Sequence, residues 1–486
     1  MLPESPPAGT TVVPNRIGIE QVVEGDVCLR VTDPGTDDTV GWVPYHGEAI
    51  AREAVDAAAA ALPAWRARPP GERADCLRRF AASMLAQQRV LARQLTREQG
   101  KPLTEAMGEI AYAASFLEWS AEEGRRLAGE WYHAHHSDKR ILVLRQPLGV
   151  VAAITPWNFP AAMVTRKLGP ALAVGCTVVL KPAEQAPLTA LALAELALQA
   201  GIPPGVFNVV TGDADAIGRA WLGDARVRKL SFTGSTEVGR LLVARAATQL
   251  TRLSLELGGH APLLVFEDAD LDAAVRGAIA AKFRNAGQTC ICPNRAYVHA
   301  AVADAFVARV RDQVAGMFLG HGLDDGVQVG PLIDDDAVAK VRAHLDDARD
   351  RGATVQCGGN IVQPRFNLTH RFCEPTVLTG LDPAMAIARE ETFGPVLAVQ
   401  TFEDDDHAIA LANDTPWGLA AYAYTRELSR ALRVAEALEF GIVGLNDTAV
   451  SNAQAPFGGL KHSGWGREGG KWGVEDYVDV KYVSIG

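Results

Sequence analysis

Short apolar runs alternate with longer amphipathic segments between residues 140 and 257 of this 486-residue chain. The apolar runs have the length of β-strands, whereas the segments between them space their apolar residues as helices do. Strands that are apolar throughout are buried on both faces, as in a parallel sheet with helices on each side. The alternation therefore predicts an α/β fold with a doubly wound sheet. The predicted strands are Ile141–Leu144, Gly149–Ile154, Cys176–Leu180, Val206–Val210, Lys229–Phe232 and Arg252–Leu255, and the predicted helices are Leu188–Ala200 and Ser235–Ala247.

The C-terminal half repeats this pattern, with a strand at Pro262–Phe266, a helix at Leu271–Arg284 and a strand at Arg295–His299. A chain of this length exceeds what one hydrophobic core usually organises. We therefore expect two α/β domains that meet near Glu256–Gly259, preceded by a helical region from Glu48 to about Leu127.

Composition limits the partners that the chain is expected to have. A net charge of -11 and a pI near 5.5 argue against nucleic acid. The first residues lack the basic and apolar regions of a secretory signal, and the longest apolar stretch is about half of the ~20 residues that a membrane span needs. Seven cysteines without a regular spacing are typical of reduced thiols. We expect a cytoplasmic protein with no membrane or nucleic acid partner.

Cys290 lies in the segment GQTCIC (residues 287–292), directly after a predicted helix. A turn at this point would let its sulfur face a cleft, and a nucleophilic cysteine needs partial exposure and thiolate character. A lone cysteine is more often a small buried residue, so the argument depends on the other motifs of the chain.

Two further motifs place polar side chains at the ends of predicted strands. Glu256 precedes two glycines in LELGG (residues 255–259), where a carboxylate is either a surface acid or a general base. Asn158 lies in PWNFP (residues 156–160), where its amide either caps a helix or donates to a developing oxyanion. Neither motif decides between its alternatives alone.

Two other motifs suggest a phosphate or ribose site. Gly234 and Ser235 end a strand and begin a helix, and N–H groups at a helix N-terminus favour phosphate. Their spacing differs from the G-x-G-x-x-G dinucleotide fingerprint. Lys181 and Glu184 follow a strand in KPAE, where charged residues of an open α/β sheet can bind ribose or form a solvated loop.

Taken together, these segments resemble the aldehyde dehydrogenase family from about residue 30 to the C-terminus. The motifs occur in the order of that family: PWNFP, KPAE, FTGS, LELGG, GQTC, EETFGP (residues 390–395) and APFGG (residues 455–459). The resemblance implies an NAD(P)-binding domain at 1–132 and 147–256, a catalytic domain at 257–445, an oligomerisation β-region at 133–146 and 470–486, and a loop at 446–469 that returns to the cleft. It also implies a dimer or tetramer.

By resemblance, the Cys290 thiolate attacks an aldehyde, and the Asn158 amide and the Cys290 N–H bind the resulting oxyanion. Glu256 then activates the water that hydrolyses the thioester. The resemblance also implies a cofactor site, with Glu184 favouring NAD⁺ and with NADP⁺ as the alternative. The residues expected to bind the cofactor are Trp157, Asn158, Lys181, Glu184, Gly234, Ser235, Leu257, Glu391 and Phe393.

The class of substrate can be narrowed from three residues, Arg166, Arg284 and Ser451. Their surroundings resemble those of succinate-semialdehyde dehydrogenases, in which two arginines and a serine bind the distal carboxylate. The alternative for each arginine is that it forms a structural ion pair and does not bind the substrate. Glutarate semialdehyde is the close alternative, because one methylene is worth only ~1–3 kcal/mol in a pocket.

Three points complete the prediction. Cys292, two residues after the nucleophile, is either a redox-sensitive resolving thiol or a packed residue that Pro293 holds in place. The histidines at 133, 135 and 136 are expected in a polar hairpin turn, and no metal is expected. A non-catalytic protein of this fold would lack the nucleophile, and the CoA-acylating subgroup usually lacks the base, so the presence of Cys290 and Glu256 argues against both.

Overall fold

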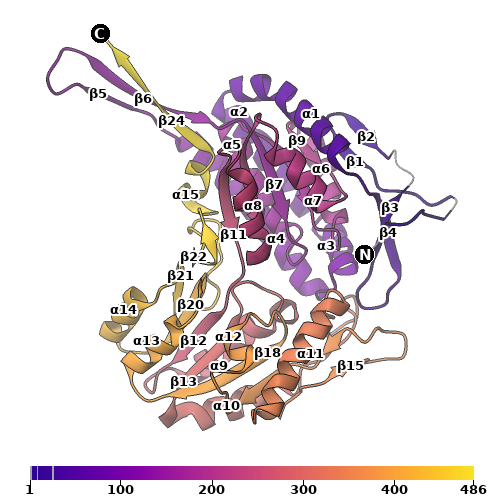
Figure 1. Ribbon diagram of the computed structural model, residues 1–486, viewed down its shortest axis with the longest axis vertical. Coiled ribbons are helices and arrows are strands. Elements are labelled where there is room, and N and C mark those ends of the chain that lie inside the picture. The colour runs from indigo at the N-terminus through magenta and orange to yellow at the C-terminus, as the bar shows by residue number, and fades with distance from the viewer. Residues whose placement is uncertain (1–2, 8, 24–26) are drawn as a thin grey trace.

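Two large β-sheets organise the computed structural model, which describes residues 3–7, 9–23 and 27–486 (Figure 1). The first sheet has the strand order β2-β1-β9-β8-β7-β10-β11-β23, and its strands from β9 to β11 run parallel. The chain leaves β7 toward β8 on one side and later returns to place β10 on the other. The strands are β1 Asn15–Ile17, β2 Glu20–Val22, β7 Val150–Thr155, β8 Thr177–Pro182, β9 Phe207–Val209, β10 Val227–Thr233, β11 Arg252–Glu256 and β23 Gly464–Trp465.

Helices cover both faces of this sheet because its strands are apolar on both sides. Val150 and Ala152 of β7 pack against α1, α7 and α8, whereas Val151 and Ala153 face the core formed with α2 to α6. Gly100, with φ 99°, ends α3 in the left-handed conformation that favours glycine. The helices are α1 Glu48–Ala67, α2 Pro70–Ala86, α3 Gln88–Gln99, α4 Leu103–Arg126, α5 Ala162–Val174, α6 Leu188–Gln199, α7 Ala214–Leu222 and α8 Thr236–Ala246.

The second sheet has the order β14-β17-β18-β13-β12-β20-β21, and only β14 is antiparallel to its neighbour. Helices again lie on both faces, as Figure 1 shows in the lower half. The strands are β12 Ala261–Val265, β13 Pro293–His299, β14 Thr354–Cys357, β17 Thr376–Thr379, β18 Val396–Phe402, β20 Ala420–Tyr424 and β21 Ile442–Leu445. The helices are α9 Leu271–Phe283, α10 Ala300–Val314, α11 Asp335–Asp350, α12 Ala386–Arg389, α13 Asp405–Asn413 and α14 Leu428–Ala437.

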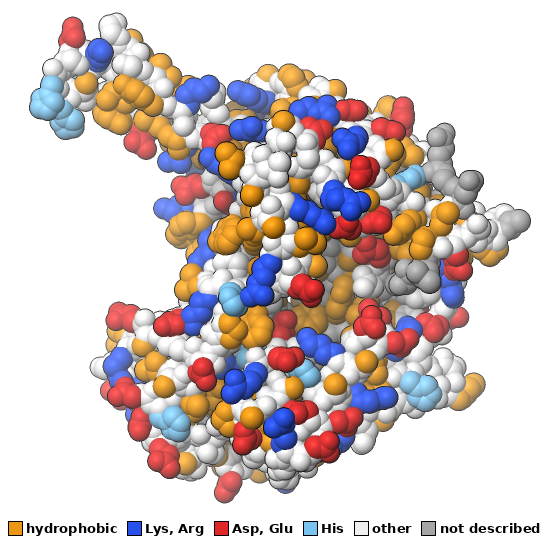
Figure 2. Space-filling view, in the orientation of Figure 1, with side chains coloured by type: hydrophobic (Ala, Val, Ile, Leu, Met, Phe, Trp, Pro, Cys, Tyr) orange, Lys and Arg blue, Asp and Glu red, His pale blue; other side chains and the backbone are white. Residues whose placement is uncertain are grey.

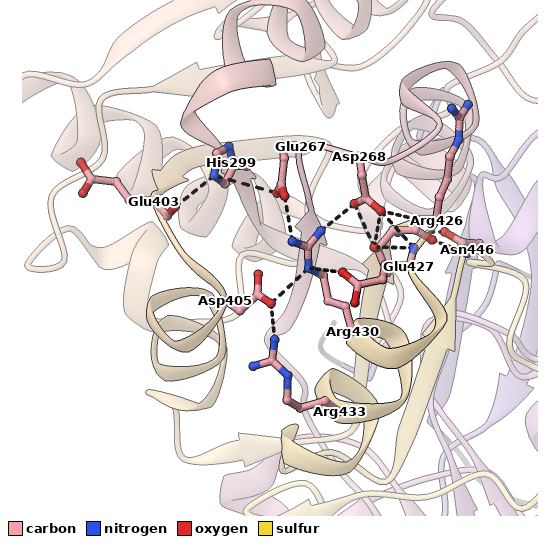
Figure 3. A network of polar contacts seen from close by, with 11 residues as sticks. Glu267, Asp268, His299, Glu403, Asp405, Arg426, Glu427, Arg430, Arg433 and Asn446 are labelled. Atoms are coloured by element: carbon pink, nitrogen blue, oxygen red, sulfur yellow. Dashed lines mark hydrogen bonds and ion pairs between the residues drawn. The ribbon is translucent and has the colours of Figure 1, made fainter.

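Arg430 on α14 connects several elements at the edge of this second unit (Figure 3). Its guanidinium lies 2.7 Å from Glu267 and 2.8 Å from Asp268, both after β12, and 3.1 Å from Asp405 at the start of α13. Asp268 also accepts hydrogen bonds from the N–H groups of residues 426 and 427. The network fixes α14 against the loop that follows β12.

A third sheet of three strands projects from the body as an arm (Figure 1). β6 (Arg140–Pro147) pairs with β5 (Glu130–His133) and, antiparallel along its full length, with the C-terminal β24 (Val478–Ile485). The space-filling view shows hydrophobic side chains gathered on this arm, with a histidine cluster at its tip (Figure 2). The exposed apolar side chains of the arm include Trp131, Tyr132 and Tyr482.

Smaller elements complete the chain. A hairpin of β3 and β4 lies near the N-terminus, and β22 pairs with β19 close to the second sheet. No helix among the described residues is long and apolar enough to cross a membrane. The bounds are β3 Cys28–Thr32, β4 Thr39–Pro44, β15 Ile361–Val362, β16 Phe372–Cys373, β19 Trp417–Gly418, β22 Leu460–Lys461 and α15 Gly470–Glu475.

The predicted α/β fold is confirmed, and the predicted strands and helices of both halves lie within a few residues of the observed ones. The main local difference follows α9. The prediction extended this helix to Arg284, but it ends at Phe283 because Asn285 and Ala286 have φ angles of 51° and 53°. The segment at 446–469 is also not all loop, since β23 joins the first sheet beside β11.

Candidate active site

Cys290 lies on a turn between α9 and β13, and the backbone of that turn is unusual. Asn285, Ala286 and Gly287 all have positive φ angles. A Cβ at Gly287 would lie 2.1 Å from the Gly394 carbonyl oxygen, so only glycine fits there. The turn brings the Cys290 side chain out of the core and into the space between the two large sheets.

Two cavities meet at Cys290. The first, of about 340 Å³, is lined by residues of α4, α5, the nucleophile turn and the segment after β21, and we call it the substrate pocket. The second, of about 480 Å³, lies between the ends of β7, β10 and β11 on one side and α11 and residues 391–393 on the other, and we call it the cofactor cleft. Cys290 and Met163 line both cavities. A group bound in either cavity can therefore lie next to the Cys290 sulfur, so that groups in the two cavities can meet there.

The cofactor cleft opens where the order of the strands reverses. Pro156, Trp157 and Asn158 follow β7, while Gly234 and Ser235 follow the adjacent β10. Ligands of open α/β sheets bind at such switch points, beyond the carboxyl ends of the strands. The location of the cleft therefore follows from the topology of the first sheet.

Asn158 is buried with its side chain next to the nucleophile turn. Its Nδ2 donates to the Gln288 carbonyl over 3.1 Å, and its Oδ1 has no hydrogen-bond partner among the described residues. An amide nitrogen carries two N–H groups, so one donor of Asn158 is left for a further acceptor. The role of this donor in binding an oxyanion at Cys290 stays a prediction.

Glu256 is buried at the end of β11, and neither of its carboxylate oxygens has a hydrogen-bond partner among the described residues. Burial raises the pKa of Glu256 well above its usual value, and the nearby Glu468 carboxylate raises it further. Lys167 Nζ lies 2.5 Å from Glu468 and 2.6 Å from the Thr233 hydroxyl. An unpartnered buried carboxyl with a raised pKa is suited to taking up a proton.

The substrate pocket combines aromatic walls with cationic groups. Arg166, on α5, lies over the Phe457 ring at 3.9 Å, and its Nε is 2.8 Å from Glu468 Oε2. Its Nη2 is buried without a hydrogen-bond partner among the described residues. Arg284 lies 5.4 Å from the Phe159 ring, and the Ser451 hydroxyl contacts the Tyr112 hydroxyl. All three predicted substrate residues line this pocket.

The cofactor cleft contains most of the residues expected to bind a cofactor. Phe393 meets Trp157 edge to face at 5.6 Å, and φ of Phe393 is 55°. Glu391 accepts a hydrogen bond of 3.0 Å from the Gly259 N–H, and burial raises the pKa of Glu391 to about 7. Leu257 lines the same cleft, and its own N–H donates to the Ser463 carbonyl.

The residues predicted to bind phosphate or ribose differ in whether their polar groups already have partners within the protein. Ser235 caps α8 by accepting from the Val238 N–H, while the Gly234 N–H is already bonded to the Glu256 carbonyl over 3.0 Å. Lys181 and Glu184 form an ion pair with each other and lie outside the residues that line the cleft.

The thiol of Cys292 is buried away from both cavities. It donates to the Lys282 carbonyl over 3.5 Å, and all seven cysteines are free thiols. Burial raises the pKa of the Cys290 thiol to about 12, whereas the positive charge of Arg166 acts in the opposite direction. The redox role of Cys292 stays a prediction.

Comparison with known proteins agrees with this geometry, because a model of the aldehyde dehydrogenase family matches residues 23–483. The chain belongs to the aldehyde dehydrogenase family. The NADP⁺ succinate-semialdehyde dehydrogenase of Escherichia coli is 56% identical over 458 residues, 94% of each chain. The glutarate-semialdehyde dehydrogenase of Pseudomonas putida KT2440 is 55% identical over 457 residues, again 94% of each. The crystal structure of a succinate-semialdehyde dehydrogenase from Burkholderia pseudomallei has a TM-score of 0.95 at 52% identity and covers 97% of both chains.

Several residues of this aldehyde dehydrogenase site were missed by the sequence prediction, among them Tyr112 and Glu468. A further pair was also missed: Lys101, on the segment that joins α3 to α4, and Glu109, on α4, form a buried ion pair of 2.6 Å at the pocket wall. One signal pointed to this group. Glu109 is a charged residue beside the apolar Ile110 on a helix, and an acid at a core-facing position usually has a partner.

Proposed function

We propose that this chain oxidises succinate semialdehyde to succinate with NAD(P)⁺. The observation that carries the proposal is the location of Cys290 between the cofactor cleft and a pocket that contains two arginines and a serine. An arginine guanidinium is the natural partner for a carboxylate, and the pocket is small enough for a short chain. Two relatives with succinate-semialdehyde in their names support the same substrate.

Glutarate semialdehyde is the second candidate, because two of the most similar relatives are named for it. The pocket of about 340 Å³ does not separate substrates that differ by one methylene. A third relative, at 51% identity, is named 3-sulfolactaldehyde dehydrogenase. All three substrates carry an anionic group beyond the aldehyde, which is the feature that Arg166 and Arg284 would bind.

In the first step, the Cys290 sulfur forms a bond to the aldehyde carbon, and the carbonyl π electrons move to the oxygen. The free N–H of the Asn158 amide and the Cys290 backbone N–H stabilise this oxyanion. Before the C–S bond forms, the thiol gives its proton to water; burial opposes this loss and the positive charge of Arg166 favours it. When the C–O π bond forms again, the C–H bond breaks with its electron pair, and a thioester to Cys290 is left.

NAD(P)⁺, when bound, is the acceptor of that hydride. The residues of the cleft fit such a group: Glu391 for ribose hydroxyls, the aromatic pair of Trp157 and Phe393 beside a ring, and the Ser235 end of α8 for phosphate. We propose Lys181 and Glu184 for the other ribose. A carboxylate at 184 favours NAD⁺ over the 2′-phosphate of NADP⁺, whereas the Escherichia coli relative is named for NADP⁺, so both cofactors belong in the test.

Glu256 completes the cycle by removing a proton from the water that attacks the thioester. Its raised pKa makes it a stronger base than an exposed carboxylate. The Lys167 and Glu468 pair lies beside it and can share the charge that the proton brings. As the C–S bond of the thioester breaks, Glu256 passes this proton to the Cys290 sulfur, so the products are succinate and a free Cys290 thiol.

We also propose the domain bounds given by the sequence, a cytoplasmic location and a homo-oligomer. The hydrophobic clusters of the two large sheets are separate, which supports the division near residue 256. The arm presents exposed Trp131, Tyr132 and Tyr482, as a surface that binds a second copy of the chain would. Seven free thiols support the cytoplasm.

The test is a steady-state comparison of four aldehydes, each with NAD⁺ and with NADP⁺: succinate semialdehyde, glutarate semialdehyde, butanal and benzaldehyde. Butanal matches the four-carbon chain without the carboxylate. We expect kcat/KM for succinate semialdehyde to exceed that for butanal by about a hundredfold, as for a charge-assisted contact. Equal values for the two would reject the proposed substrate.

A further inference from the structure

Asn285 is a buried residue with hydrogen bonds to several separate segments. Its Nδ2 donates to the Asn158 carbonyl over 3.1 Å and to the Gln288 carbonyl over 3.2 Å. Its Oδ1 accepts from Gln99 Nε2 over 2.9 Å, and its backbone N–H donates to Glu105 Oε2 over 2.8 Å. The side chain therefore uses donor and acceptor groups together, and the residue joins α3, α4, the loop after β7 and the nucleophile turn.

The contacts of Asn285 converge on Asn158. The Gln288 carbonyl, which accepts from Asn285, also accepts from the Asn158 side-chain amide. Asn285 thus binds both the main chain of Asn158 and the acceptor that orients its amide. With one amide N–H held by Gln288, the direction of the second N–H is determined by the same contact.

Lys101 supports the same loop through a second contact to the Asn158 carbonyl. Its Nζ lies 2.7 Å from the Asn158 carbonyl and 2.6 Å from Glu109, whose other oxygen accepts from the Ala161 N–H over 2.9 Å. The Asn158 carbonyl therefore accepts two hydrogen bonds, and its loop is attached at two points. A donor held in this way needs no reorganisation when an oxyanion forms.

The backbone at Asn285 explains why an asparagine is needed. Its φ of 51° lies in the left-handed region, which asparagine and glycine adopt more readily than other residues. Glycine would provide the backbone without the side-chain bonds, and aspartate would keep an acceptor for Gln99 without the two donor bonds. These two substitutions separate the conformation of the turn from its hydrogen bonds.

We propose that Asn285 is a positioning residue for the oxyanion site, acting through Asn158 by fixing the direction of its free amide N–H. It touches neither substrate nor cofactor in this role. The inference rests on the proposed function only in requiring a thiohemiacetal oxyanion at Cys290, whatever the aldehyde. It extends the catalytic site to a residue that lines neither the substrate pocket nor the cofactor cleft.

The experiment measures the rate constant of the first burst of NADH by rapid mixing. The variants are Asn285→Gly, Asn285→Asp, Asn158→Ala and the double variant Asn285→Gly with Asn158→Ala. We expect each Asn285 variant to slow the burst about a hundredfold, as for a misdirected catalytic group, with KM and NAD⁺ affinity changed by less than about threefold. The double variant should be no slower than Asn158→Ala alone, because Asn285 acts through Asn158.

Asn208 provides the matched control. It is buried and makes three hydrogen bonds, two to the separate segments of Gly18 and Val178 and one to the nearby Gly205, but it lines neither cavity. Asn208→Gly should lower the melting temperature without slowing the burst. Asn285→Asp serves as the second variant if Asn285→Gly does not fold, since it keeps the side-chain volume.

Two results would overturn the proposal. One is a burst rate constant in the Asn285 variants that lies within threefold of the wild-type value. The other is a double variant slowed by the product of the two single losses, which would mean that Asn285 acts independently of Asn158. The series is run with whichever aldehyde the wild type oxidises fastest, so a failure of succinate semialdehyde as the substrate is seen in the wild type and does not affect this comparison.

Discussion

Arg166 and Arg284 lie in the same pocket but in different electrostatic settings. Arg166 is buried and already forms an ion pair with Glu468, next to Glu256. Arg284 lies at the start of the left-handed turn and is exposed to solvent, with its guanidinium near the Phe159 ring. The first arginine therefore belongs to the buried charge network of the base, whereas the second is the freer of the two to meet a carboxylate.

This difference predicts different behaviour in variants. Arg284→Met keeps an apolar stem but loses a charge-assisted contact. It should lower kcat/KM for succinate semialdehyde by a factor that corresponds to ~2–4 kcal/mol of transition-state stabilisation. The same variant should change kcat/KM for butanal by less than about threefold. Arg166→Met should slow both aldehydes, since it leaves Glu468 with one cation fewer beside Glu256. If Arg284→Met slows both aldehydes equally, Arg284 supports the turn and does not bind the carboxylate.

At the scale of elements, the strands and helices could be predicted because each depends on a local pattern of apolar residues. The individual motifs were also visible, since Asn158, Glu256 and Cys290 each follow a strand or helix. The contacts between them were not visible. The Tyr112 and Ser451 hydroxyls meet across 339 residues of sequence, and Lys167 meets Glu468 across 301. Such pairs have no spacing that a single sequence can reveal.

The β3–β4 turn shows how a small element connects the two halves of the molecule. Asp33 Oδ2 lies 2.8 Å from His321 Nε2, and the turn also bonds through the Gly35 carbonyl to the Thr369 N–H. The hydrogen bond to Asp33 raises the pKa of His321 above its usual value. A raised histidine pKa stabilises the folded protein fully below the unfolded pKa of about 6.5, and this stabilisation is lost as the pH rises through the folded pKa.

Asp33→Asn should therefore destabilise the protein in a pH-dependent way. Asparagine keeps the acceptor for the Gly35 N–H but loses the charge that favours protonated His321. We expect the melting temperature to fall by roughly 2–4 °C at pH 6 and by clearly less at pH 9. Glutamine cannot titrate in this pH range. The melting temperature of His321→Gln should therefore also lie below that of wild type at pH 6, and this difference should become smaller as the pH rises to 9. A loss for Asp33→Asn that is equal at both pH values would contradict the role given to His321.

At the scale of the whole molecule, the active site exists because two units with separate hydrophobic cores face each other across the cofactor cleft. The first sheet provides Asn158, Glu256 and the end of α8 at the carboxyl ends of its strands, while the second unit provides Cys290 and Glu391. The C-terminal segment then returns past both, with Ser451 in the substrate pocket and β23 beside β11. The site is complete only when all three parts are in place, so chemistry at Cys290 reports on the whole fold.

The most direct test of the account is the mass of the Glu256→Gln protein after it is mixed with succinate semialdehyde and NAD⁺. Without the base, hydrolysis should be slower than hydride transfer, so the covalent intermediate should accumulate. We expect one burst of NADH and a mass increase equal to one succinyl group, located on the peptide that contains Cys290 and absent in Cys290→Ala. A full burst of NADH without any succinyl group on Cys290 would contradict it.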